Sequence, residues 1–216
     1  TKIMVMAQGE AYEPGKRTAP MGRGAAPDAR PAGDAAVITL RVVDDYWNMV
    51  SVSTQVTVET SDLYDTNPGL TAFTGSTTVN VFMRSAGQNT VKATGGSWIW
   101  PNDANPSSAI TVNAKTADRL LILLPGETRR QGKTGAPAGK EGSRSPWQAG
   151  RASSITVYGA DEYYNTASFS GSIYVRTIDD NFDVPPSSQA LAAGATGFTL
   201  TLVTAKSQKL QADSPS

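Results

Sequence analysis

The chain has 216 residues, with 19 basic and 19 acidic side chains and neither cysteine nor histidine. The balanced charge argues against a nucleic-acid-binding protein, and the missing side chains exclude Cys- or His-ligated zinc, thiol nucleophiles and a Ser-His-Asp triad. Glycine and proline number 20 and 13, which favours short strands and turns over long helices. No apolar run approaches the roughly 18–20 residues of a transmembrane segment, so none is expected.

Apolar and β-branched residues alternate along most of the chain. This period of two predicts strands with one buried and one solvent-facing side. In chain order, the predicted strands lie at 2–6, 37–43, 55–60, 77–83, 89–93, 109–114, 119–124, 154–160, 172–177, 198–203 and 208–212. Turn signals recur at about every 8–12 residues, which predicts an all-β fold built as a two-sheet sandwich.

The chain contains an internal repeat. The string DDYWN at 44–48 returns as DEYYN at 161–165, which is 117 residues later. In the same ungapped register, residues 2–68 share 21 identities in 67 positions with the second copy. A repeat of this length indicates two separate domains rather than a solenoid, whose repeats have about 20–50 residues. We therefore expect two β-sandwich domains, at 1–117 and 118–216.

The last predicted strand of the first copy, 109–114, has no equivalent in the second copy, which reaches Ser216 first. We expect the second domain to lack this strand, as it would in a piece of a longer polypeptide. An unpaired sheet edge attracts further strands. A neighbouring molecule that supplies the missing strand is therefore the alternative to simple truncation.

The acidic strings raise two interpretations. Asp and Asn form turns through bonds to nearby main-chain groups, so DDYWN and DEYYN predict turns in which an aromatic side chain covers one end of the sandwich. Carboxylates are also ligands that Ca²⁺ prefers. The candidate calcium ligands are Asp44, Asp45, Asp161 and Glu162, together with Asp179, Asn181 and Asp183 of the string DDNFD.

Two long segments, 9–33 and 126–150, are rich in Gly, Pro, Ala and basic residues and read as surface loops. Two tryptophans, Trp98 and Trp100, lie close together before the last strand of the first copy. Paired aromatics stack on sugars or pack against a protein partner. They are therefore the candidate contacts for a glycan or a partner, or else they cover a domain junction.

The ordered motifs resemble tandem bacterial immunoglobulin-like repeats of very large surface proteins. The segment LLPGE, then GKTGAP, AG and a strand that ends in DEYYN carry this resemblance in the second copy. The first copy departs from it, with MAQGE in place of LLPGE. The resemblance implies two tandem immunoglobulin-like β-sandwiches and members that act as spacers, adhesins or surface-layer and filament components, without enzymatic activity.

The expected function follows from these features. We expect an extracellular structural protein at the cell surface, acting as a spacer or stalk in a repeat array or as a subunit of a filament or sheath. Its partners would be neighbouring repeats or identical subunits. The alternative is an adhesin that binds a glycan or a surface protein. No catalytic residue and no cofactor are expected, apart from the calcium alternative above.

Overall fold

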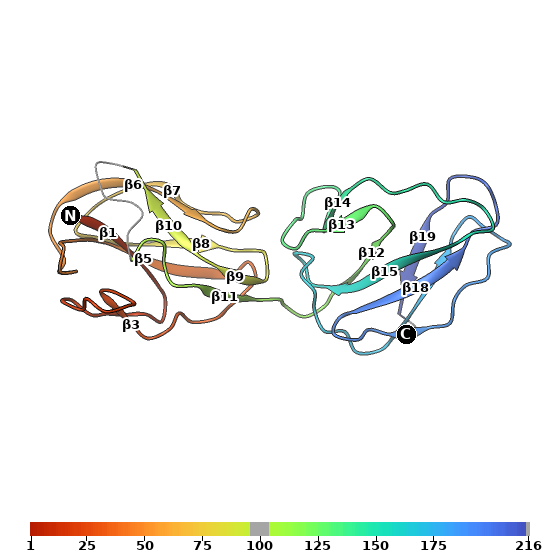
Figure 1. Ribbon diagram of the computed structural model, residues 1–216, viewed down its shortest axis with the longest axis horizontal. Helices are drawn as coiled ribbons and strands as arrows, with labels where there is room; N and C mark the ends of the chain where they lie inside the picture. The colour runs from red at the N-terminus through yellow and green to blue at the C-terminus, as the bar shows by residue number, and fades with distance from the viewer. Residues whose placement is uncertain (96–103, 215–216) are drawn as a thin grey trace. The chain divides into compact units, whose positions relative to one another are not determined.

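The computed structural model describes residues 1–95 and 104–214, and all regular structure in them is β. Within these residues there is no helix with the length and hydrophobicity of a membrane span. The chain divides into two compact units, Thr1–Asn113 and Ala114–Ser216 (Figure 1). The repeat placed this boundary four residues later, after residue 117.

The strands of the first unit include all six that alternation predicted, each shifted by a few residues at most. They are β1 (Lys2–Ala7), β2 (Ala11–Tyr12), β3 (Arg23–Gly24), β4 (Arg30–Pro31), β5 (Ala35–Val43), β6 (Ser53–Thr60), β7 (Gly69–Thr74), β8 (Ser76–Phe82), β9 (Gly87–Asn89), β10 (Val91–Thr94) and β11 (Ile110–Asn113).

Two three-stranded antiparallel sheets form the body of the first unit. One has the order β1-β5-β8 and the other the order β10-β6-β7. Alternate residues of the two central strands are buried, including Ile38 and Leu40 on β5 and Val56 and Val58 on β6. This alternation buries one face of each sheet, as the period of two predicts.

A third, smaller sheet lies along one side of the first unit. Its central strand, β11, runs parallel to β4 and antiparallel to β9. Ile110 and Val112 of β11 are 1% and 2% exposed. The strand therefore contributes two buried side chains to the first unit in addition to its main-chain pairing.

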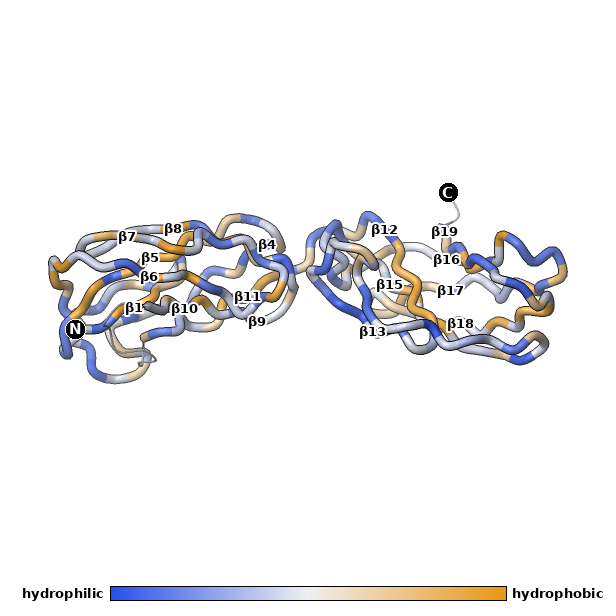
Figure 2. Tube along the Cα trace, turned by 90° about the horizontal axis from the view of Figure 1, so that it is seen from above, coloured by the Kyte–Doolittle hydropathy of each residue, from blue (hydrophilic) through white to orange (hydrophobic). Residues whose placement is uncertain are grey.

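The second unit repeats the same plan with fewer strands. They are β12 (Arg119–Leu123), β13 (Glu127–Arg129), β14 (Lys140–Gly142), β15 (Ala152–Ala160), β16 (Ser172–Thr177), β17 (Gln189–Ala190), β18 (Ala195–Thr201) and β19 (Leu210–Asp213). The sheets have the orders β12-β15-β18 and β17-β16-β19. One cluster of buried side chains joins them, with Ile155 and Val157 from β15 and Ile173 and Val175 from β16. In Figure 2 the apolar colours run along strands such as β1 and β12, whereas many turns are hydrophilic.

The two long segments read as loops are not free of regular structure. Each contains a short hairpin, β2 with β3 in the first unit and β13 with β14 in the second. These strands have only two or three residues each. They are too short to show alternation, so the sequence pattern could not reveal them.

Candidate functional site: a groove on the second unit

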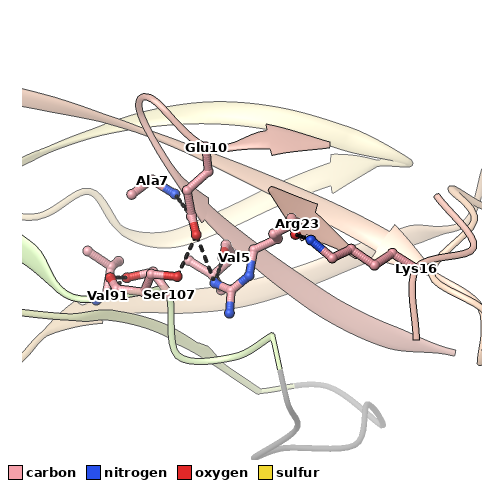
Figure 3. Close-up of polar contacts among 8 residues, drawn as sticks. Val5, Ala7, Glu10, Lys16, Arg23, Val91 and Ser107 are labelled. Atoms are coloured by element: carbon pink, nitrogen blue, oxygen red, sulfur yellow. Dashed lines mark hydrogen bonds and ion pairs between the residues drawn. The ribbon is translucent and has the colours of Figure 1, made fainter. Parts of the chain in front are cut away.

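A buried ion pair anchors the segment that follows β1 (Figure 3). The side chains of Glu10 and Arg23 are 0% and 4% exposed, and their charged atoms lie 3.7 Å apart. The carboxylate accepts a hydrogen bond from the N–H of Ala7, and the guanidinium donates to the carbonyl of Val5. Burial lowers the pKa of Arg23, and the neighbouring Glu10 opposes this shift. Removal of either partner would leave a buried charge uncompensated, so the pair fixes the path of this segment.

The second unit makes the same contacts at the repeat-related positions. Glu127 accepts a hydrogen bond from the N–H of Leu124 and lies 2.8 Å from the ammonium group of Lys140. That ammonium group also donates to the carbonyl of Ile122. The repeated Gly-Glu dipeptide, at 9–10 and 126–127, therefore has a structural role.

The string DDYWN forms a turn closed by its first residue. Oδ1 of Asp44 accepts hydrogen bonds from the N–H groups of Tyr46 and Asn48, at 2.8 and 2.9 Å. Oδ2 accepts a third bond from the side-chain amide of Asn48 at 3.1 Å. These bonds, and the side-chain amide above all, lower the pKa of Asp44. The carboxylate is thus occupied by its own turn.

The string DEYYN forms the same turn with a more deeply buried acid. Asp161 and Asn165 are both 0% exposed. The Asp161 carboxylate accepts bonds from the N–H groups of Tyr163 and Asn165, from the side-chain amide of Asn165 and from the N–H of Lys115. Four donors meet the two oxygens, so the carboxylate is saturated by protein groups.

Trp47 packs in a buried cluster of the first unit, as the sequence predicted, and Tyr164 holds the equivalent position in the second turn. Trp47 has a φ of 67° and is 2% exposed, and Tyr164 has a φ of 62°. Each aromatic ring lies over a glycine. A Cβ on Gly22 would lie 3.0 Å from Cβ of Trp47, and a Cβ on Gly139 would lie 2.6 Å from Cδ1 of Tyr164. Both glycines also have positive φ, so the close approach and the backbone each require glycine there.

The neighbouring calcium candidates form ion pairs instead of a cluster. Asp45 lies 3.6 Å from the ammonium group of Lys2, and Glu162 lies 3.1 Å from that of Lys115. Each of these acids therefore faces a cation of its own unit.

The candidates in DDNFD do not converge on one point either. Asp183 accepts a bond of 3.3 Å from the N–H of Thr177, while Asp179 is half-buried and Asn181 is exposed. Across residues 1–95 and 104–214, no three His, Cys, Asp or Glu side chains are grouped so that they could hold a metal ion.

A chelator is expected to leave the stability of the chain unchanged. A metal that binds only the folded state raises the melting temperature by mass action, and its removal lowers it. Because hydrogen-bond donors already occupy the carboxylates of Asp44 and Asp161, we expect the same melting temperature in excess EDTA and in millimolar Ca²⁺. Thermal unfolding followed by circular dichroism measures this, and a reproducible rise in Ca²⁺ would contradict it.

A second buried carboxylate ties two loops of the first unit together. Asp62, which is 4% exposed, accepts bonds from the N–H of Tyr64 in its own loop and from the N–H groups of Arg84 and Ser85 after β8. The hydroxyl of Ser85 donates a further bond of 2.6 Å. The connection between β6 and β7 is thereby fixed to the end of β8.

Asp180 does the same in the second unit. It accepts bonds from the N–H groups of Phe182, Val203 and Thr204, from the hydroxyl of Thr204 and from the side-chain amide of Gln208. These bonds, led by the one from the Thr204 hydroxyl, hold the pKa of Asp180 well below its usual range. Asp62 and Asp180 lie 118 residues apart, one more than the repeat offset, because one residue is inserted after the preceding strand.

One surface feature of the second unit, a groove, is not explained by these structural contacts. A groove of about 480 Å³ lies between the segment 144–149 and the segment 202–210. Leu124, Trp147 and Leu210 line it, and all three also pack against the core cluster of the unit. Arg144 and Lys206 add positive charge.

The same position in the first unit is filled by β11. Main-chain bonds establish the correspondence, because the N–H of Gly33 donates to Met83 as that of Gly150 donates to Leu202. Met83 is 2% exposed, whereas Leu202 is half-buried. Other corresponding pairs behave alike: Ala32 is buried and Ala149 exposed, and Val91 is buried and Leu210 half-buried. The groove therefore lies at the position that the third sheet, β4-β11-β9, has in the first unit. In the described part of the second unit, no strand takes the place of β11.

The lining of the groove combines apolar and polar side chains. Its lining is apolar, hydroxyl, amide or basic, and no described lining residue is a carboxylate that could act as a general base. Sequence reasoning predicted the unpaired edge but did not identify Trp147 as part of it. Trp98 and Trp100, the predicted contacts for a glycan or partner, lie outside the described residues.

Comparison with known proteins gives one structural likeness to report. No family model matches the chain, and no curated protein matches it. The solved structure of the Yersinia pseudotuberculosis adhesin InvE is similar over 98% of this chain, with a TM-score of 0.39 and 16% sequence identity. The chain spans 55% of the length of that protein.

Proposed function

We propose that the chain is part of an extracellular structural protein that displays tandem immunoglobulin-like β-sandwich units at a bacterial cell surface. The units act as a spacer or stalk, or as part of a filament or sheath, and carry no enzymatic activity. Neighbouring repeats or identical subunits are the partners.

The recurrence of one set of polar anchors in both units carries this proposal. The pairs Glu10–Arg23 and Glu127–Lys140 and the turn acids Asp44 and Asp161 make equivalent contacts in each unit. Each unit thus holds its own loops with its own residues. Two units that repeat their internal supports suit a protein whose work is mechanical.

Stretching the whole chain between two surfaces tests this role. A spacer of two self-contained units is expected to unfold in two separate force events, each releasing on the order of 350 Å of chain. The events should return after relaxation, because each unit refolds by itself. A single event that releases the whole chain, or extension without a force peak, would contradict the proposal.

A binding role is the second candidate, because the second unit presents the groove described above. An adhesin of this kind would hold a glycan or a surface protein. A glycan array tests the glycan form of this alternative: a specific hit that is lost in Trp98→Ala or Trp147→Ala would favour it, whereas an array without hits would count against a glycan ligand.

A further inference from the structure

We propose that Met49 is an oxidation site, and that its sulfoxide strengthens the contact that holds the hairpin β2–β3 on the first unit. The oxidant is a peroxide, and the modified atom is the thioether sulfur. This inference concerns a modification of the first unit alone and does not require the spacer function.

Met49 is the methionine that an oxidant in solution reaches most easily. All five methionines lie in the first unit. Met4, Met6 and Met83 are at most 4% exposed, and Met21 is half-buried. Met49, in contrast, is 51% exposed. Because a peroxide must reach the sulfur atom, Met49 is expected to react before the others.

The sulfur of Met49 contacts a guanidinium group that also holds the hairpin. Nη1 of Arg41, on β5, donates a hydrogen bond of 3.5 Å to Sδ of Met49. The same guanidinium lies 4.5 Å from the ring centroid of Tyr12, on β2, which is within the range of about 6 Å for cation–π contacts. Tyr12 donates from its hydroxyl to the carbonyl of Trp47 at 2.7 Å. Arg41 therefore joins the hairpin to the segment that contains Met49.

The second unit makes this contact with the two residues exchanged. At the repeat offset of 117 residues, Arg129 on β13 takes the position of Tyr12, and Tyr158 on β15 takes that of Arg41. The guanidinium of Arg129 again lies 4.5 Å from the centroid of the tyrosine ring. Nη2 of Arg129 donates to the carbonyl of Tyr164, as the hydroxyl of Tyr12 does to the equivalent carbonyl. Both units therefore keep the stack of an arginine on a tyrosine, although its members have changed places.

The two units differ in the atom that accepts the bond from Nη1 of the arginine. In the second unit this acceptor is Oγ1 of Thr166. Thr166 corresponds to Met49, because each forms a β-bridge with the last residue of the preceding strand, Ala160 or Val43. A thioether sulfur is a weak acceptor, whereas a hydroxyl oxygen is an ordinary one. Oxidation of Met49 would give the first unit an oxygen acceptor at this position as well.

The reaction changes a single atom of the side chain. A lone pair of Sδ attacks one oxygen of hydrogen peroxide, so that an S–O bond forms and the O–O bond breaks. The departing hydroxide takes the proton of the transferred oxygen and leaves as water, and sulfur has then lost the two electrons that the peroxide gains. The sulfoxide oxygen accepts a charge-assisted bond from the guanidinium, which is about twice as strong as a bond between neutral groups. At the exposed Met49 this gain comes without the damage that the same change causes inside a core.

Peroxide treatment of the whole protein tests the proposal. Peptide mass spectrometry is expected to find the first added oxygen on Met49. Amide hydrogen exchange of the hairpin β2–β3 should then slow about fivefold, the effect of one net hydrogen bond. The hairpin β13–β14 is the internal control, because the second unit contains no methionine and its exchange should not change. A methionine sulfoxide reductase should restore the original exchange rate.

Three variants separate this contact from other effects of peroxide. Met49→Leu removes the oxidisable sulfur, so peroxide should no longer slow the exchange of the hairpin. Met49→Gln places an amide oxygen on a side chain of similar length and should slow the exchange without peroxide. Arg41→Leu removes the donor, so Met49 should still be oxidised but without slower exchange.

Three results would overturn the proposal. They are first oxidation at another methionine, unchanged or faster exchange of the hairpin β2–β3 after oxidation of Met49, and slower exchange that persists in Arg41→Leu. If Arg41→Leu does not fold, Met49→Gln decides, and an exchange rate equal to that of the untreated protein would contradict the contact. None of these results bears on the stretching experiment, so this inference and the proposed function fail separately.

Discussion

Replacing Trp47 by alanine is expected to lower the free energy of unfolding of the first unit by about 4 kcal/mol, the middle of the range for a buried tryptophan. The ring is 2% exposed and belongs to a cluster with Met4, Met6 and Val43. The substitution leaves a cavity at the end of the core and keeps a positive φ at a residue with a Cβ. This loss is a large fraction of the 5–15 kcal/mol that stabilises a typical domain.

Denaturant-dependent hydrogen exchange, read separately for peptides of each unit, measures the effect. Tyr46→Ala is the matched control, because Tyr46 is adjacent in the same turn but 57% exposed. Its expected cost is below about 1 kcal/mol, as for a surface substitution. Equal losses for the two variants would mean that the tryptophan does not cover the core.

Replacing Asp62 by alanine is the second large effect, with an expected loss of about 3 kcal/mol in the first unit. The carboxylate accepts four hydrogen bonds from Tyr64, Arg84 and Ser85, and their removal leaves several buried donors without an acceptor. We also expect faster amide exchange at Arg84 and Ser85, because the carboxylate holds both N–H groups.

The control for this change is Glu59→Ala, which lies near the end of strand β6, three residues before Asp62. Glu59 is 46% exposed at its side chain and pairs with Lys92 across the sheet. Exposed pairs of this kind contribute about 0.2–1 kcal/mol. If Asp62→Ala costs no more than Glu59→Ala, the carboxylate does not fix the loops.

Alternation and repetition made most of the fold predictable from the sequence. The major strands follow the period of two, and the turn interpretation of DDYWN and DEYYN is confirmed by the bonds of Asp44 and Asp161. These features are local, because a strand pattern and an Asp turn depend on residues close together in the chain.

Features that depend on contacts between residues far apart in the chain were not predicted from the sequence. The ungapped register aligned Asp62 with Asp179, yet the neighbouring Asp180 makes the equivalent bonds because one residue is inserted. The hairpin β2–β3 depends on the ion pair of Glu10 with Arg23, whose members are separated by a long loop. Trp147 lines the groove only because the folded chain brings 144–149 beside 202–210.

The loop carboxylates have a consequence for how this architecture changes over time. The buried carboxylates of Asp62 and Asp180 hold their loops to the rest of each unit. Leu63 and Phe182, at the tips of these loops, are 88% and 77% exposed. Neither side chain is a donor to these carboxylates, and only the N–H of Phe182 bonds to Asp180 among the contacts described above. Each unit therefore separates the residues that keep it folded from those that meet its surroundings, so new recognition properties can arise at the tips with little loss of stability.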